Sequence, residues 1–339
     1  MPIETISDRK GRNLARDICL VDSLLDPLTR TRFISEYWAK KAVHISGNPN
    51  RLEPVFDKTR FFAAIAKARQ SGESGNFSVD KFIQDFDGSW TCSESIGSDD
   101  IDDLVRNRTT VCVRAIVNGD NALRDFGESF KRALGLVGSI SFNCYYSGDA
   151  SGADTHFDCS VTTALQIEGS KRWRFATRSV LPWPPGNARM QKDGTPQWVL
   201  PWLGGRGWDV LSPQQMDFEE VVLEAGDILC LPAGTWHSAK ADGHSLALNM
   251  TYLPLPMCTI VERVLAFAFA SRPEWRGGIP PTANVEDFDA DGAPDHVIRY
   301  LQDCLADVRN VVMNGGLAQS QSTLLWRTEL DLSDDGPTS

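Results

Sequence analysis

Three residues in this chain have the types and the order that suit a mononuclear metal site. His156 and Asp158 are separated by a single residue, and His237 follows much later in the chain. Two imidazoles and one carboxylate can occupy one face of Fe(II) and leave its other positions open for further ligands. Residues two apart on an extended strand point to the same side, so His156 and Asp158 could bind one ion together.

The third candidate ligand, His237, follows two turn signals. Gly226-Asp227 predicts a tight turn into the apolar run 228–231, and Pro232-Ala233-Gly234 predicts a second turn just before His237. A late strand that returns beside an early one would bring His237 to His156. Only the fold could achieve this, because the two histidines are far apart in sequence.

A positive charge lies on the apolar face of a predicted strand. Alternation places Lys171, Trp173 and Phe175 on one face, and Arg172 and Arg174 on the other. The two arginines then face solvent, so this basic run is not interpreted as a nucleic-acid patch. A lysine among large apolar residues is costly unless an anion pairs with it, and the alternative is a lysine whose ammonium group reaches the surface.

The central part of the chain has the two-residue period of β-strands, with Gly, Pro and Asp between the runs. We expect a turn at 168–170 and a long Trp-rich insertion at 178–218. Many short strands with such turns predict an α+β protein whose core is an antiparallel jelly roll, a double-stranded β-helix. The expected strands are 140–146, 161–168, 171–177, 220–224, 227–231 and 245–253.

Three regions follow from this pattern. Residues 1–139 are expected to form helices and strands that pack on the core, 140–257 the jelly-roll core, and 258–339 a helical region. The first 18 residues are polar and are expected to be loosely held. Asp26 before Pro27 predicts the start of the next helix.

Composition excludes several classes of protein. The formal net charge of −11 disfavours direct nucleic-acid binding, which depends mainly on Lys and Arg. None of the eight cysteines forms a C-x-x-C pair, so a zinc ribbon is not expected. No apolar run is long enough to span a membrane and no apolar leader is present, so we expect a cytoplasmic protein.

Several motifs together resemble a known family. His156-Phe157-Asp158, the run from Ala164 to Phe175 (ALQIEGSKRWRF) and the run from Ala225 to His237 (AGDILCLPAGTWH) are similar to the JmjC/cupin-like Fe(II)- and 2-oxoglutarate-dependent oxygenases. The closest resemblance is to the protein-hydroxylase branch, which includes the ribosomal oxygenases and the asparaginyl hydroxylase of hypoxia signalling. It covers roughly residues 140–255.

The resemblance implies a set of roles for individual residues. Iron would be bound by two histidines and one aspartate, and 2-oxoglutarate and O2 would be co-substrates. A lysine would pair with the distal carboxylate of 2-oxoglutarate, and two further polar side chains would contact the co-substrate. The resemblance gives the role of iron ligand to His156, Asp158 and His237. It gives the distal carboxylate to Lys171, and the further co-substrate contacts to Tyr145 and Asn249.

The resemblance implies hydroxylation of a side chain in a protein or peptide, with succinate and CO2 as co-products. Trp198 and Trp202 in the insertion are candidate substrate contacts, and packing of the insertion on the core is the alternative. Other hypotheses are a small-molecule or nucleoside-modifying oxygenase, and a metal-binding cupin that acts only as a binding module. The apolar helices expected at 258–270 and 294–313 could form a homodimer.

Overall fold

The computed structural model describes residues 6–71, 79–84, 90–95, 100–199, 208–269, 273–278 and 295–313. Contacts divide the chain into two units, Met1–Pro254 and Leu255–Ser339. The first unit contains every described strand, and the described part of the second unit consists of helices.

The strands of the first unit all pair in antiparallel fashion. Their bounds are β1 (Val43–Ile45), β2 (Val79–Gln84), β3 (Trp90–Ser95), β4 (Thr110–Val113), β5 (Gly138–Ser147), β6 (Gly152–Phe157), β7 (Val161–Ala176), β8 (Asn187–Met190), β9 (Pro196–Val199), β10 (Phe218–Leu223), β11 (Ile228–Leu231) and β12 (His237–Pro254).

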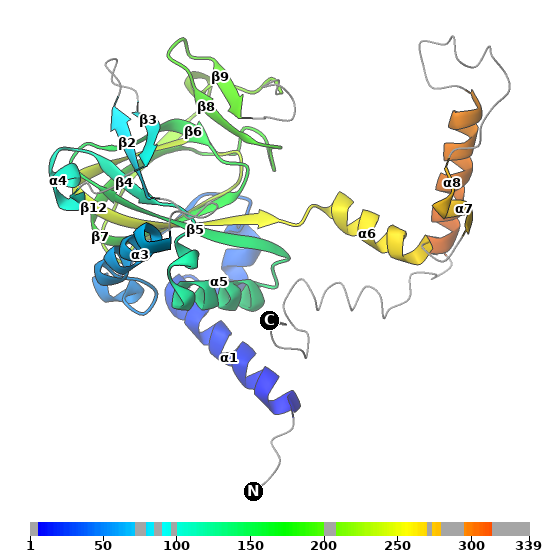
Figure 1. Ribbon diagram of the computed structural model, residues 1–339, viewed down its shortest axis with the longest axis horizontal. Coiled ribbons are helices and arrows are strands. Elements are labelled where there is room, and N and C mark those ends of the chain that lie inside the picture. Colours follow the sequence, from blue (N-terminus) through cyan, green and yellow to red (C-terminus); the bar gives the residue numbers. More distant parts are fainter. Residues whose placement is uncertain are drawn as a thin grey trace, which may run out of the picture. The chain divides into compact units, whose positions relative to one another are not determined.

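Two long strands, β7 and β12, organise the sheet (Figure 1). They pair with each other along most of their length, and each has two partners on its other edge. The first half of β7 pairs with β11 and its second half with β10, whereas β12 pairs first with β6 and then with β5. Two groups of strands therefore share β7 and β12, which is the predicted double-stranded β-helix.

The turn predicted at 168–170 is wrong, because β7 continues through it. Gly169 has φ +63°, and a Cβ at this position would lie 1.9 Å from the carbonyl oxygen of His244. The pairing register with β12 shifts at this point, between Asp242 and Ser245. The glycine therefore marks a bulge where the strand changes neighbours, and not the end of a strand.

The predicted alternation after the bulge is confirmed. Lys171, Trp173 and Phe175 are buried, and Arg172 and Arg174 are exposed. β7 pairs with β12 on both sides of the bulge, and Lys171 lies on the buried face of the strand.

Helices cover one side of the first unit, where α1 and α5 lie beside each other near β5 (Figure 1). The helices of this unit are α1 (Ile6–Leu25), α2 (Arg30–Arg32), α3 (Lys58–Ser71), α4 (Ile101–Arg106) and α5 (Asn121–Leu134). The prediction of a loosely held N-terminal segment is wrong for the described part. Residues 6–18 belong to α1, Ile18 packs against the main core, and the buried Asp17 carboxylate accepts a 2.7 Å hydrogen bond from Arg132 on α5.

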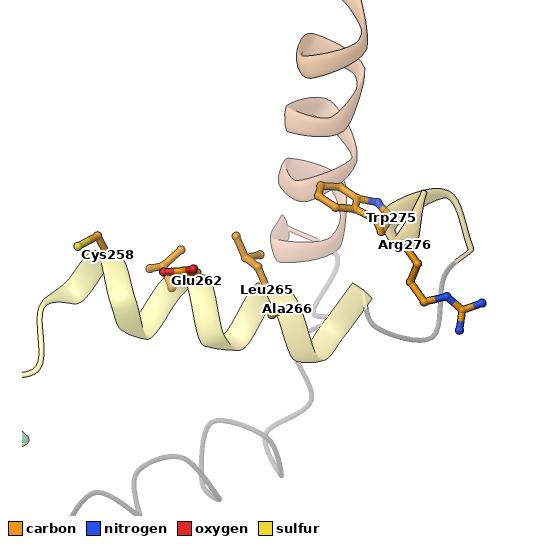
Figure 2. A pocket seen from close by; sticks show the side chains of 7 residues that line it. Cys258, Glu262, Leu265, Ala266, Trp275 and Arg276 are labelled. Atoms are coloured by element: carbon orange, nitrogen blue, oxygen red, sulfur yellow. The ribbon is translucent and has the colours of Figure 1, made fainter. Parts of the chain in front are cut away.

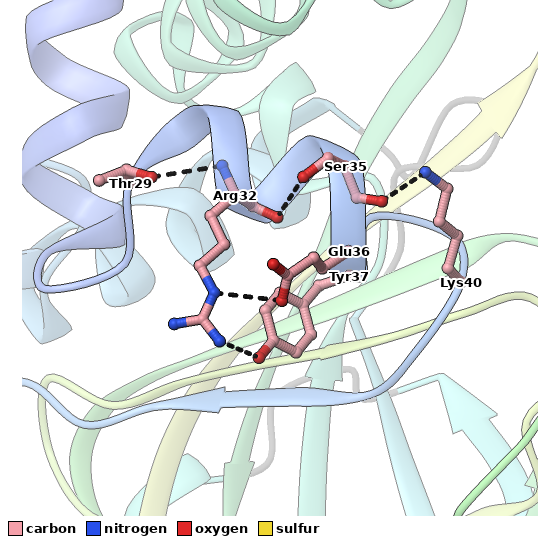
Figure 3. A network of polar contacts seen from close by, with 6 residues as sticks. All are labelled: Thr29, Arg32, Ser35, Glu36, Tyr37 and Lys40. Carbon is pink, nitrogen blue, oxygen red and sulfur yellow. Dashed lines mark hydrogen bonds and ion pairs between the residues drawn. The ribbon is translucent and has the colours of Figure 1, made fainter.

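The helix start predicted at Asp26-Pro27 is also displaced. The backbone N–H of Asp26 donates to the carbonyl of Asp22, so Asp26 belongs to the end of α1. The next helix begins at Arg30, and the Thr29 hydroxyl accepts a hydrogen bond from the N–H of Arg32 as its N-cap. A π-helical turn, Phe33–Tyr37, follows, and Figure 3 shows the polar contacts that link it to α2 and to the residues after it.

The second unit contains α6 (Met257–Phe269), α7 (Pro273–Arg276) and α8 (Asp295–Met313). The Trp275 indole N–H donates a 2.8 Å hydrogen bond to Asp307, which joins α7 to α8. None of the described helices combines the length and the apolar character needed to cross a lipid bilayer.

Candidate active site

The β6–β12 pair brings the two histidines of the motif together. His156 near the end of β6 is the direct partner of His237 at the start of β12, and their ring centroids are 4.2 Å apart. Asp158 immediately follows β6, and its carbonyl accepts a 2.8 Å hydrogen bond from the N–H of Gly234. One ligand atom from each of His156, Asp158 and His237 lies within 4.8 Å of the others.

The turn before His237 requires a glycine. Gly234 has φ +75°, and a Cβ there would lie 2.0 Å from the carbonyl oxygen of Leu181. The turn therefore approaches both the Asp158 loop and the chain after β7 closely. This contact fixes where β12 begins and hence where His237 lies.

Neighbouring groups orient each candidate ligand. The Nδ1 atom of His156 lies 2.7 Å from the carbonyl oxygen of Asp154, and Nδ1 of His237 lies 2.8 Å from that of Thr235. A carbonyl can only accept, so both rings carry their proton on Nδ1 and keep the Nε2 lone pair for a metal. The hydroxyl of Thr162 donates a 2.9 Å hydrogen bond to Oδ2 of Asp158.

Burial keeps His237 neutral. Burial first, and then the neighbouring His156, lower the pKa of His237 to about 4, against the opposing effects of Asp158 and of the hydrogen bond to Thr235. An imidazole must be neutral to bind a metal, so this environment favours the metal-binding form at physiological pH. Two neutral imidazoles and one carboxylate are a donor set that fits Fe(II).

A cavity of about 190 Å³ adjoins the two histidines, between the two groups of strands. Its polar lining includes two of the predicted co-substrate residues, Tyr145 and Asn249, together with Lys171. The full lining is Thr110, Arg114, Tyr145, Gly152, Ala153, His156, Lys171, Trp173, His237, Ala239 and Asn249. The structure thus brings Lys171, Tyr145 and Asn249 to the same cavity as both histidines.

Lys171 is a buried cation, and no carboxylate pairs with it among the described residues. Burial lowers its pKa to about 8. Arg114 also lines the cavity, but it forms an ion pair with Asp80. Of these two cations of the cavity lining, Lys171 is therefore the one without a counter-charge among the described residues. An anion bound in the cavity would provide that counter-charge.

Two other polar atoms of the cavity lining are buried without a hydrogen-bond partner in the described structure, namely Nε1 of Trp173 and Oδ1 of Asn249. The Trp173 indole stacks on His237 with 5.7 Å between ring centroids. Burial raises the pKa of Tyr145 well above its ordinary value, so its phenol keeps its proton. Unpaired buried polar groups are rare in folded proteins, so these atoms indicate a polar ligand.

Comparisons with known proteins agree with this geometry. Residues 129–257 match the JmjC domain family. The matched stretch, which runs from the end of α5 to the start of α6, is thus similar to JmjC domains. It is 25% identical to the uncharacterized protein YxbC of Bacillus subtilis over 250 residues, which are 69% of this chain and 70% of YxbC.

A second relative is the bifunctional lysine-specific demethylase and histidyl-hydroxylase NO66 of Drosophila grimshawi. It is 24% identical over 286 residues, which are 79% of this chain but only 36% of NO66. The structure of YcfD, a ribosomal oxygenase from Escherichia coli, in complex with cobalt and 2-oxoglutarate aligns with a TM-score of 0.54 and 15% identity, over 91% of this chain and 73% of YcfD. An X-ray structure of YcfD aligns with a TM-score of 0.53 and 17% identity, over 88% of this chain and 71% of YcfD. At these identities the structural similarity establishes a common fold.

Trp198 lies behind the candidate metal ligands and not in the cavity lining. It is buried against Phe157, which separates His156 from Asp158 in sequence, with ring centroids 5.3 Å apart. Its indole N–H donates a 3.1 Å hydrogen bond to the carbonyl of Trp208. These contacts support packing of the insertion over the substrate contact predicted for Trp198, and Trp202 lies outside the described residues.

Sequence reasoning missed two residues of the cavity, Thr110 and Arg114. In the structure, alternation along β4 places Thr110 and Arg114 on one face. The sequence does not show which face of β4 points into the cavity, because every residue of this strand is buried.

We predict that replacing any of the three candidate ligands with Ala abolishes Co(II) binding measured by titration calorimetry. Thr162→Val should weaken it about 10- to 100-fold, because Asp158 loses its orienting donor. The exposed His244 provides the control, and His244→Ala should bind as the wild type does. Unchanged affinity in His237→Ala or Asp158→Ala would contradict the site.

A second prediction concerns Trp198. Trp198→Ala should lower the free energy of unfolding by about 3–5 kcal/mol, because a large side chain is lost from a packed cluster. Trp183 in the same insertion is 45% exposed, so Trp183→Ala should have little effect. Normal stability of Trp198→Ala together with a raised KM for substrate would instead favour the predicted substrate contact.

Proposed function

We propose that this protein is an Fe(II)- and 2-oxoglutarate-dependent oxygenase that hydroxylates a side chain of a protein or peptide. The observation that carries the proposal is the placement of an uncompensated buried cation, Lys171, in the same cavity as His156 and His237. A ligand that chelates a metal at one end and carries an anion at the other satisfies both features. 2-Oxoglutarate has this chemistry.

We assign the metal to His156, Asp158 and His237. Bound iron would supply the oxygen chemistry, in which oxidative decarboxylation of 2-oxoglutarate to succinate and CO2 is coupled to hydroxylation of the substrate. These three side chains would hold the ion, and the adjoining cavity would receive the co-substrate. The two imidazole rings donate hydrogen bonds to backbone carbonyls, and the Thr162 hydroxyl donates to Asp158, which holds all three side chains in place for this task.

The cavity residues would bind and orient the co-substrate. We assign the distal carboxylate to the Lys171 ammonium group, which lies 5.5 Å from the centre of the Tyr145 ring. Asn249 and Trp173 carry the unpaired polar atoms and would bind the co-substrate nearer to the metal. Burial of these groups excludes water and strengthens their electrostatic interactions with an anion.

A protein or peptide substrate is proposed because the named relatives include a histidyl-hydroxylase and a ribosomal oxygenase. The net charge of −11 would favour a basic polypeptide. A cytoplasmic location remains the expectation from sequence.

The proposal is tested by adding Fe(II), 2-oxoglutarate and O2 to a lysate of cells that lack the protein. Wild-type protein should form succinate and add the mass of one oxygen atom to a peptide found by mass spectrometry, and His156→Ala should do neither. Succinate without a modified peptide would favour a small-molecule or nucleoside substrate. Failure to form succinate in the presence of bound iron would contradict the oxygenase function.

The lowered pKa of Lys171 predicts how co-substrate affinity depends on pH. Only the protonated ammonium group can pair with a carboxylate, so the Kd for 2-oxoglutarate should be constant below about pH 8 and rise above it. The limiting slope is about tenfold per pH unit. Calorimetry with Co(II)-loaded protein would measure this dependence.

Lys171→Arg is the matched control for this pH dependence. A guanidinium group stays protonated over this range, so the Kd of this variant should stay flat from pH 7 to pH 10. An equal slope in both proteins would assign the titration to another group.

We further propose that the second unit forms a homodimer. A groove of about 680 Å³ is lined mainly by apolar residues of α6, together with Trp275 (Figure 2). On α8, Ile298, Leu301 and Leu305 recur at helical spacing and are 42%, 50% and 67% exposed. A second copy of this apolar surface would bury both sets of side chains.

Light scattering coupled to size exclusion should therefore give twice the mass of one chain. Leu305→Glu should shift the protein to the monomer, because a charge would be buried at the interface. Gln302→Glu adds the same charge at another exposed position of α8 and should leave the dimer intact. A monomeric wild type at micromolar concentration would refute the dimer.

A further inference from the structure

A path of aromatic side chains begins directly behind the candidate metal ligands. Phe157 separates His156 from Asp158 in sequence, and Trp236 directly precedes His237. The rings of Phe157 and Trp236 are 4.6 Å apart between centroids, and both side chains are fully buried. Neither ring lines the cavity beside the histidines, so the path starts at the ligands without passing through the cavity.

The insertion extends this path to the surface. The ring of Trp198 lies 5.3 Å from that of Phe157, and the ring of Trp208 lies 5.8 Å from that of Trp198. Exposure is 0% for Phe157 and Trp236, 8% for Trp198 and 48% for Trp208. These four side chains are called the aromatic path below. Its tryptophans matter because indole gives up one electron more readily than most other side chains.

The two buried tryptophans of the aromatic path hold their indole protons in hydrogen bonds to backbone carbonyls. Trp236 donates a 2.9 Å hydrogen bond to the carbonyl of Leu211, and Trp198 donates a 3.1 Å hydrogen bond to the carbonyl of Trp208. A backbone carbonyl accepts a hydrogen bond but is too weak a base to take up the proton. The half-exposed indole of Trp208 donates to no group in the described part of the chain, so its proton is available to water.

These environments decide where a missing electron would come to rest. Removing an electron from a buried indole leaves a cation in apolar surroundings, which is costly without a counter-charge. Trp236 and Trp198 can therefore transmit an electron, but they are poor places to keep the positive charge. Trp208 can release its N–H proton to water and become a neutral radical, so the oxidation would end there.

Trp173 does not offer a second route of this kind. Its ring stacks on His237 from the cavity side, but its side chain is only 3% exposed. Among the described residues no further aromatic ring contacts Trp173. The route through Trp198 is therefore the one that reaches solvent.

We propose that the aromatic path protects the site by carrying oxidising equivalents to Trp208 when O2 reacts without a substrate. This inference rests on the proposed function, because the oxidant arises from O2 and 2-oxoglutarate at the metal site. Without a substrate, the two electrons that substrate hydroxylation would supply must come from elsewhere. The aromatic path can deliver them one at a time, before they are taken from side chains that bind the metal.

The electrons and protons balance in two identical cycles. In each cycle, Trp208 gives one electron along the aromatic path toward the metal site and its N–H proton to water. A one-electron reductant such as ascorbate then returns one electron to Trp208 at the surface, and water returns the proton. Over both cycles, O2, 2-oxoglutarate, two electrons and two protons give succinate, CO2 and one molecule of water.

The test mixes Fe(II)-loaded protein and 2-oxoglutarate with O2, without a substrate, and freezes the mixture for electron paramagnetic resonance. Wild-type protein should give a radical whose spectrum narrows when its tryptophans are ring-deuterated, which identifies an indole radical. After longer reaction without ascorbate, peptide mass spectrometry should find oxygen added at Trp208. Succinate is measured in the same samples.

Three variants locate the radical. Trp208→Phe removes the exposed end of the aromatic path and should lose the radical. Trp198→Phe keeps a ring in the packed cluster but removes the indole in the middle, so it should lose the radical and the oxidation of Trp208. Trp183→Phe is the matched control, because Trp183 is 45% exposed in the same insertion and contacts no aromatic ring of the described residues. It should give the wild-type radical.

Each outcome decides a separate question. Succinate without a tryptophan radical would overturn the proposal, and so would a radical that is unchanged in either path variant or lost in Trp183→Phe. Succinate that forms only when a lysate supplies substrate would overturn it too, because no oxidising equivalents would then be left over. If Trp198→Phe does not fold, Trp208→Phe decides alone. Absence of succinate with bound iron, with or without the lysate, would instead contradict the proposed function.

Discussion

The pairing of β6 with β12 is the constraint on which the candidate site depends. It sets His156 directly opposite His237 and, through the hydrogen bond from Gly234 to Asp158, holds the carboxylate beside them. A slip of one residue in this register would turn either histidine to the other face of the sheet. The long β7–β12 ladder opposes such a slip, because it fixes β12 along most of its length.

The second organising feature is a buried positive charge that the protein itself leaves without a counter-charge. Arg114 has Asp80, whereas no carboxylate pairs with Lys171 among the described residues. Burial without a counter-ion reduces stability, and a bound dicarboxylate would restore it. The buried charge of Lys171 therefore both lowers the stability of the ligand-free protein and makes the cavity selective for an anion.

Local patterns were sufficient to predict much of this arrangement. Period-two alternation correctly placed Lys171 and Trp173 on the buried face of β7. The N-terminal helix and the bulge at Gly169 were missed, because both depend on contacts that are distant in sequence. Ser147 has no motif of its own, and only the strand register shows that it lies beside Lys171.

The central claim is that His156, Asp158 and His237 hold Fe(II) with two adjacent positions open to a chelating 2-oxo acid. Anaerobic addition of 2-oxoglutarate to the Fe(II)-loaded protein measures this most directly by visible absorption. A metal-to-ligand charge-transfer band should appear in the wild type and in His244→Ala, and should be absent from Asp158→Ala. Iron bound to the wild type without this band, at saturating 2-oxoglutarate, would contradict the account.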